Sequence, residues 1–258
     1  MSDITMGQPK VALGVGSLIG DSFSILFSKF IQVVAVAFVP SLIGYLLSGA
    51  LIGFDVAIGV EEPQFTSAGS GFAFALSAIV NMVVYSFATA LLVQLAYDAK
   101  LGRPVQIGRY FAPALSALVP LGILSIVVSI IVGLGFALFI VPGLWLYAVF
   151  SVMAPAVVIE RVGFGGMGRS ATLTKEYRWP IAGALLLGIL CVVVINLVAG
   201  LLMGVIVAVG GTFLGLIIFA AVSTVGAGFV SIVIALIYAR LREIKEGVSV
   251  DQIASVFD

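Results

Sequence analysis

The sequence predicts an all-α membrane protein that crosses the bilayer six times. Hydrophobic residues make up 62% of its 258 positions and charged residues only 9%, the composition of a chain that lies mostly in hydrocarbon. Six apolar runs approach or exceed the roughly 20 residues that a helix needs to cross about 30 Å of bilayer. They occupy residues 30–54, 71–97, 114–138, 140–159, 180–208 and 214–239. No stretch is left for a separate soluble domain, so we expect residues 1–258 to form one integral membrane domain.

The positions of the basic residues predict the orientation of these crossings. All twelve Lys and Arg residues fall in the terminal segments or in alternate connections between the apolar runs. The remaining connections, residues 55–70, 139–141 and 209–213, contain no Lys or Arg. Because basic residues accumulate on the cytoplasmic side of membrane proteins, we expect both termini to be cytoplasmic. The expected location is the bacterial inner membrane.

An amphipathic segment precedes each pair of crossings. In the first, about residues 15–29, apolar side chains share one helical face while Asp21 and Lys29 can stay out of lipid. That face comprises Leu18, Phe23, Ile25, Leu26 and Phe30. The second and third segments lie at about residues 105–117 and 165–178. We therefore expect three cytoplasmic interfacial helices, each followed by a hairpin of two crossings.

Short sequence matches favour three related units. Val39-Pro40 in the first crossing matches Val119-Pro120 in the third, and residues 121–124 recur as residues 187–190. Each unit contains an even number of crossings, so the predicted hairpins are parallel repeats in the membrane. Matches this short also arise by chance in a chain rich in Leu, Gly and Ile, and that alternative stays open.

The polar residues within the crossings are few. Asn81 and Asn196 are expected to form interhelical hydrogen bonds. No Asp, Glu, Lys or Arg lies near the centre of a crossing, and ion-coupled transporters usually place ionisable groups there. A passive path for a neutral or amphipathic solute is still compatible with this sequence. Pro40 and Pro120 lie inside crossings and should kink them.

The stretch from Pro142 to Trp179 carries a resemblance to a known family. The stretch combines Pro142-Gly143, an aromatic-rich run, Pro155, Glu160, the Arg169-Ser170 pair and a basic-aromatic end. A second segment, the tail at residues 238–247, adds a Tyr-x-x-Leu-Arg pattern followed by Glu-Gly. These features resemble the membrane domain of some bacterial glycerophosphoryl diester phosphodiesterases and the YciC-like polytopic inner-membrane proteins, an uncharacterised family. The resemblance covers most of the chain and implies membrane architecture without an established activity.

The residues do not support carrying over phosphodiesterase chemistry. In the phosphodiesterases that this chain resembles, a separate soluble barrel with paired histidines carries out catalysis. This chain contains no histidine. That absence also removes His-based metal sites and Ser-His or Cys-His nucleophile pairs. We predict no enzyme activity, catalytic residue, cofactor or metal. A membrane-embedded lipid enzyme that uses only carboxylates stays formally open through Asp98, Glu160, Glu176, Glu243 or Glu246.

The candidate site lies where the fourth crossing meets the third amphipathic segment. A Glu160–Arg169 ion pair would lock that segment against the bundle, because an unpaired charge near the interface is costly. A second interpretation, which is compatible with the first, is that this region binds a phospholipid headgroup through its basic side chains, with an aromatic ring at the boundary of the acyl chains. The full candidate set is Glu160, Arg161, Arg169, Ser170, Lys175, Arg178 and Trp179.

Two functions are compatible with this sequence. The leading hypothesis is a non-catalytic accessory or scaffold protein that engages membrane lipids, a membrane-protein partner, or both. The alternative is a transporter or lipid-translocating permease for a neutral or amphipathic substrate. Nucleic acid is not an expected partner, since topology alone accounts for the scattered basic residues. Nothing in the sequence specifically indicates a homo-oligomer.

Overall fold

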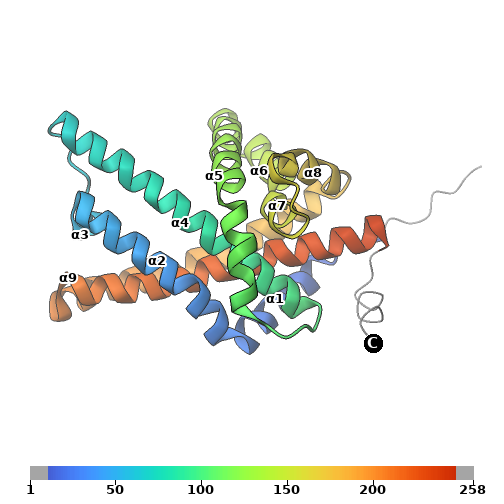
Figure 1. Cartoon of the computed structure of the whole chain (residues 1–258), viewed down its shortest axis with the longest axis horizontal. Coiled ribbons are helices and arrows are strands. Elements are labelled where there is room, and N and C mark those ends of the chain that lie inside the picture. The colour runs from blue at the N-terminus through green and yellow to red at the C-terminus, as the bar shows by residue number, and fades with distance from the viewer. Residues whose placement is uncertain (1–10, 248–258) are drawn as a thin grey trace, which may run out of the picture.

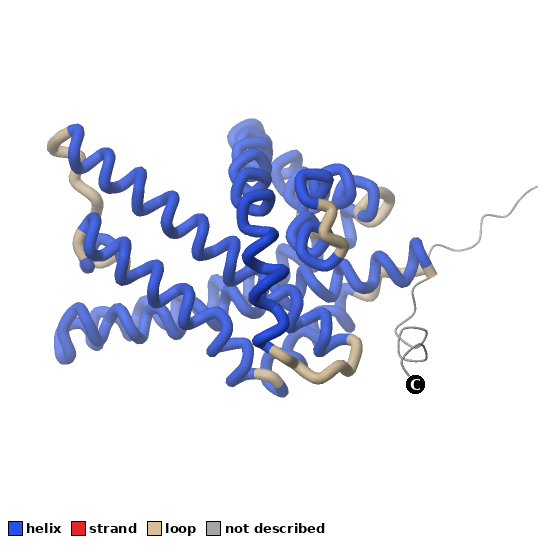
Figure 2. The backbone as a smooth tube through the Cα atoms, viewed as in Figure 1, coloured by secondary structure: helices blue, strands red, loops and turns tan. Residues whose placement is uncertain are grey.

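The computed structural model describes residues 11–247, and in the last helix it describes only the backbone of residues 198, 199, 201–210, 212 and 216. All regular structure in this part of the chain is helical (Figures 1 and 2). The elements are α1 (Val15–Ser28), α2 (Phe30–Ile52), α3 (Phe54–Ala57), α4 (Ala68–Lys100), α5 (Ile107–Leu138), α6 (Ile140–Phe150), α7 (Met153–Ile159), the 3-10 turn η1 (Gly163–Gly165), α8 (Gly166–Leu173) and α9 (Arg178–Glu246). Lys10 and both chain ends, whose cytoplasmic position the sequence predicts, lie outside the described residues.

The six predicted apolar runs are confirmed as helices. Within residues 11–247, six helical segments are long and apolar enough to cross a membrane. They are Phe30–Ile52, Ala68–Lys100, Ile107–Leu138, Ile140–Ile159, Arg178–Leu197 and Phe213–Glu246. The chain is therefore compatible with a multi-pass membrane protein, as its composition predicts.

Helix α9 contains two of these segments and folds back on itself. A straight helix of its 69 residues would be about 100 Å long, far more than one crossing needs. At Gly211 the backbone has φ 74° and ψ 170°, a conformation that is essentially restricted to glycine. Beyond this turn the second half of α9 packs back along the first half. The contact is close at two glycines: a Cβ built on Gly226 would lie 3.1 Å from Val192, and one built on Gly188 would lie 3.8 Å from Val233.

Two elements differ from the sequence prediction. Residues 105–117 do not form a separate interfacial helix, because α5 continues without interruption from Ile107 to Leu138. Pro113 and Pro120 each remove one backbone donor from α5, but neither proline ends the helix. The predicted crossing at 140–159 is instead divided at residues 151 and 152 into α6 and α7.

Glycines determine the tight turn between α5 and α6. A Cβ on Gly135 would lie 3.0 Å from Gly143 Cα, and a Cβ on Gly143 would lie 2.4 Å from the Phe136 ring. Phe139 between them is extended, with φ −161° and ψ 158°. The two helices therefore pack with their backbones almost in contact, the kind of approach that small residues permit between membrane helices.

The core lies at one end of the bundle, where α1, α4, α7, α8 and α9 meet. Its largest fully buried side chains include Leu95, Leu173, Phe229, Leu236 and Tyr238. Helix α1 packs on α9 through Leu18, Ile25 and Leu26, as its predicted apolar face requires, whereas Phe30 remains 43% exposed. Away from the core the helices diverge, with α2 and α4 leaning to the left of Figure 1 and α5 pointing away from them.

The α5–α6 turn gives a test of this packing. Gly143→Ala should lower stability by about 1–3 kcal/mol, because the added methyl group overlaps Cγ of Phe136 and the ring must move from its place against α6. Thermal unfolding of the purified protein in one detergent measures the change. Gly133→Ala is the matched control, since that glycine is helical and faces open space, so alanine should leave the melting temperature unchanged or raise it. Equal melting temperatures for the two variants would contradict the packing.

Candidate functional site

Helix α8 folds back over the end of α7. The backbone reverses at Arg161 (φ 55°) and Gly163 (φ 54°), both in the left-handed region that a side chain normally disfavours. Helix α8 then buries Gly166, Ser170 and Leu173 along one face. Gly166 fits closely, because a Cβ there would lie 2.4 Å from Val157. The third amphipathic segment is thus a separate helix seated on the bundle.

Two hydroxyl groups on this segment satisfy a backbone carbonyl at the α6–α7 break. Val149 O accepts hydrogen bonds from Ser170 Oγ at 2.7 Å and Thr174 Oγ1 at 3.1 Å, and both side chains are buried. Helix α6 ends at Phe150, so the carbonyls of its last turn lack partners within the helix. In lipid, carbonyls freed by helix breaks need such partners, and Ser or Thr side chains often supply them. Ser170, a predicted site residue, therefore has a structural role here.

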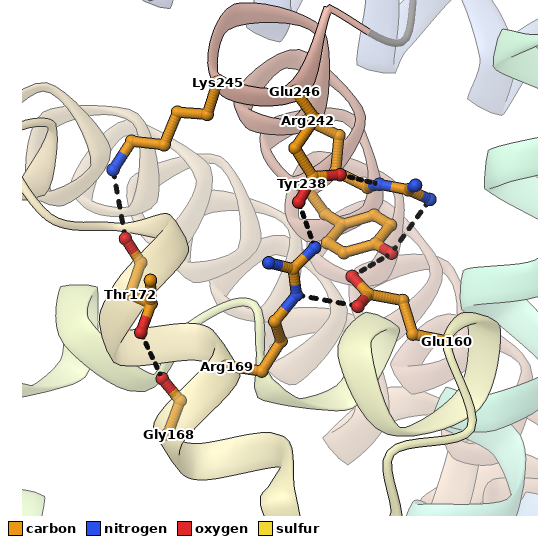
Figure 3. Close-up of polar contacts among 8 residues, drawn as sticks. All are labelled: Glu160, Gly168, Arg169, Thr172, Tyr238, Arg242, Lys245 and Glu246. Carbon is orange, nitrogen blue, oxygen red and sulfur yellow. Dashed lines mark hydrogen bonds and ion pairs between the residues drawn. The ribbon is translucent and has the colours of Figure 1, made fainter.

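Arg169 joins the end of α7 to the tip of α9 (Figure 3). Arg169 Nε donates a hydrogen bond to Glu160 Oε2 at 2.7 Å, and its Nη2 donates to Glu246 Oε1. Arg242 Nε donates to the other oxygen of Glu246 at 2.8 Å. Tyr238, buried among these groups, donates its hydroxyl to Glu160 Oε1 at 2.7 Å. We call these five residues, Glu160, Arg169, Tyr238, Arg242 and Glu246, the charged clamp.

The charges of the clamp balance each other. Two carboxylates face two guanidinium groups, and the side chains of all four are between 17% and 27% exposed. The hydrogen bond to Glu160 is the main cause that raises the pKa of Arg169 above its usual value, so this guanidinium stays charged throughout the physiological range. An unpaired charge here would be costly, and the pairing removes that cost.

A second contact from α9 closes the end of α8. Lys245 Nζ donates hydrogen bonds to Thr172 O at 3.0 Å and Lys175 O at 2.8 Å. The last carbonyls of a helix lack partners within the helix and carry a partial negative charge. A lysine ammonium is therefore well placed there, and α8 is held to the tip of α9 both through Arg169 and through the carbonyls at its C-terminal end.

The predicted site residues divide into two groups. Glu160, Arg169 and Ser170 point into the structure, and Arg178 places its guanidinium carbon 4.5 Å from the Trp145 ring centre, a cation–π contact. Three residues remain at the surface: Arg161 and Lys175 are exposed, and Trp179 is 60% exposed. We call the exposed residues Arg161, Lys175 and Trp179 the headgroup surface, after the role that the sequence predicts for them.

Other charged residues at this end also form pairs. Lys100 on α4 pairs with Asp21 on α1 at 2.7 Å, and Asp98 accepts a hydrogen bond from Tyr110 at 2.8 Å. Arg240 pairs with Glu243. In the part of the chain that the structure describes, no group of three or more Cys, Asp or Glu side chains is arranged to hold a metal ion.

Sequence reasoning found the Glu160–Arg169 pair but missed its partners on α9. Tyr238, Arg242 and Glu246 follow one another at a spacing of four, which places them on one face of a helix. That spacing predicts a polar face at the end of the last helix. Nothing in the sequence pairs this face with residue 169, because the contact depends on how α8 docks.

No protein-family model, curated protein or solved structure matches this chain.

The clamp makes a prediction about stability. Arg169→Gln should lower stability by about 1–3 kcal/mol, because it leaves Glu160 and Glu246 without their shared partner in a half-buried site. Arg240→Gln removes one positive charge from the same end of the protein, but its pair with Glu243 is more exposed and lies within one helix, so its cost should stay below about 1 kcal/mol. Melting temperatures in the same detergent compare the two. If Arg240→Gln destabilised the protein as much as Arg169→Gln, the clamp would have no special role.

Proposed function

We propose that this protein is a non-catalytic accessory or scaffold protein of the membrane that engages anionic lipid headgroups through its headgroup surface. The observation that supports the proposal is the contrast between neighbouring charges. The clamp neutralises its own charges, whereas the basic side chains Arg161 and Lys175 and the aromatic Trp179 are exposed. Basic side chains near a membrane surface attract anionic lipids, and Trp favours the interfacial zone.

The proposal includes an orientation. The described basic residues gather at the ends of helices that meet at α1, α8 and the tip of α9, the side that the positive-inside rule assigns to the cytoplasm. On this arrangement, the crossings form three parallel hairpins, the chain ends are cytoplasmic, and the membrane is the bacterial inner membrane. The resemblance to the YciC-like family, an uncharacterised family, fits such an architecture and supplies no activity.

The absence of an enzyme activity is part of the proposal, and the carboxylates support it. Glu160 and Glu246 belong to the clamp, Glu243 pairs with Arg240, and Asp98 accepts from Tyr110. A carboxylate that acts as a general acid or base must be available to the reacting proton. These four carboxylates already bind protein partners.

A lipid-translocating permease is the second candidate. It is favoured by a pocket of about 220 Å³ between α2, α4 and α9, where the polar side chains of Tyr45, Asn81, Tyr85 and Thr89 join a mainly apolar lining. Asn81 Nδ2 also donates a hydrogen bond to Ser48 Oγ at 2.8 Å, which fits the interhelical role that the sequence predicts. A permease would need this pocket to connect to both faces of the membrane for a polar headgroup to pass.

The headgroup surface can be tested in nanodiscs by energy transfer from Trp179 to dansyl-phosphatidylserine, in a Trp145→Phe background. Replacing Arg161 and Lys175 together by Gln should raise the probe fraction required for half-maximal transfer by about fivefold for each charge removed, the effect of one basic residue near an anionic surface. The matched control is the pair Lys100→Gln and Arg240→Gln, which removes the same charge from the same end at side chains that Asp21 and Glu243 already hold, and should leave transfer from Trp179 unchanged. Equal responses of the two pairs would contradict the proposed surface.

The permease alternative has its own test. Vesicles that contain the protein and a headgroup-labelled fluorescent phospholipid are treated with dithionite, which bleaches only the outer leaflet. The accessory function predicts the same bleached fraction as in protein-free vesicles. A larger bleached fraction would show lipid translocation, and would replace the accessory function with the permease.

A further inference from the structure

A cavity of about 530 Å³ opens between α2, α4 and α5. Its volume is within the range of small-molecule sites, roughly 300–1,000 Å³. Apolar side chains line it throughout, among them Val39, Val83, Phe87, Phe111 and Leu115. Phe87 and Phe111 meet edge-to-face with their ring centres 5.9 Å apart. We call this cavity the lateral groove.

The groove opens toward the lipid that surrounds a membrane protein. Val39, Phe111 and Leu115 line it, yet each is between 46% and 58% exposed. Along α5 it extends from Ile107 to Leu118, about 16 Å of helix. That length is about half of a 30 Å hydrocarbon layer, so the groove spans one leaflet, on the side of the connection between α4 and α5.

The lining chemistry favours a flexible hydrocarbon chain over a helix of another protein. Helix contacts within membranes rely on small residues that permit close approach, or on polar side chains that bond across the interface. The groove has no Gly, Ser, Thr or Asn, and Ala35 is its one small side chain. Branched and aromatic side chains instead leave an irregular apolar space, which a flexible acyl chain can follow.

Two basic residues lie at the helix starts that border one end of the groove. Lys29 immediately precedes α2, and Arg109 lies in the first turn of α5, the two helices whose early residues line the groove. In the described part of the chain neither side chain has a hydrogen bond or ion pair with the protein, in contrast to Lys100, which Asp21 holds at 2.7 Å. A positive charge without a protein partner at this level complements an anionic headgroup.

We propose that the lateral groove binds one anionic phospholipid, with an acyl chain between α2, α4 and α5 and the headgroup at Lys29 and Arg109. This site is separate from the headgroup surface formed by Arg161, Lys175 and Trp179. The groove would hold its lipid more firmly than the surrounding bilayer does, because the chain contacts protein on several sides rather than one.

The experiment is native mass spectrometry of the intact protein released from nanodiscs that contain equal amounts of phosphatidylglycerol and phosphatidylcholine. The wild-type protein should retain one phosphatidylglycerol in preference to phosphatidylcholine. Leu115→Trp fills the groove and should abolish this retention, whereas Val119→Trp, one turn further along the same helix and 64% exposed outside the groove, should preserve it. Both variants place a large apolar residue where lipid already covers the helix.

The charged residues provide a second arm that does not alter the apolar packing. Lys29→Gln with Arg109→Gln should weaken retention of phosphatidylglycerol by about fivefold per charge, whereas Lys100→Gln with Arg240→Gln, which removes two charges that already pair with Asp21 and Glu243, should leave it unchanged. Equal retention of both lipids, or retention that survives Leu115→Trp, would overturn the proposal. A stoichiometric dimer that Leu115→Trp dissociates would also overturn it, and would identify a second copy of the chain as the occupant.

Discussion

The pairing of Arg169 with Glu160 and Glu246 is the interaction on which the rest of the architecture depends. Apolar helices in lipid have no hydrophobic force that drives them together, so polar contacts and close backbone packing must hold them. Arg169 fixes the end of α7 to the tip of α9, and Lys245 fixes the end of α8 to the same tip. Together with the hydroxyl groups that satisfy Val149 O, these contacts close one end of the bundle, and the core lies there.

The closed end leaves the other parts of the bundle free to diverge. Helix α5 meets α2 and α4 beside the core and diverges from that pair away from it (Figure 1), and the lateral groove lies between these three helices. A polar end held by ion pairs and an open apolar flank fit the proposed accessory function. The clamp uses its charges for structure, so the side chains left for lipid are the exposed ones: Arg161 and Lys175 on one side, and Lys29 and Arg109 on the other.

Much of the secondary structure was predictable from the sequence, and much of the tertiary structure was not. The six apolar runs are unambiguous because hydrocarbon thickness imposes their length, and Glu160 with Arg169 was recognisable as a pair of opposite charges near an interface. The segment at residues 105–117 was wrongly separated from the crossing after it, since its amphipathic pattern does not show whether the helix continues through Pro113 and Pro120. The role of Tyr238 and Glu246 depends on how α8 docks against α9, which no local pattern in the sequence specifies.

The central claim is that the charged clamp holds α8 in one position against the bundle. Pulsed electron–electron double resonance tests it directly, with nitroxide labels at the exposed residues Ser24 on α1 and Thr172 on α8 and with Cys191 replaced by alanine. The account predicts one narrow distance distribution for the protein in nanodiscs, and a broad one once Arg169→Gln is introduced. A distribution that stays equally narrow without the Arg169 guanidinium would contradict the claim, because apolar packing alone would then be sufficient to hold α8.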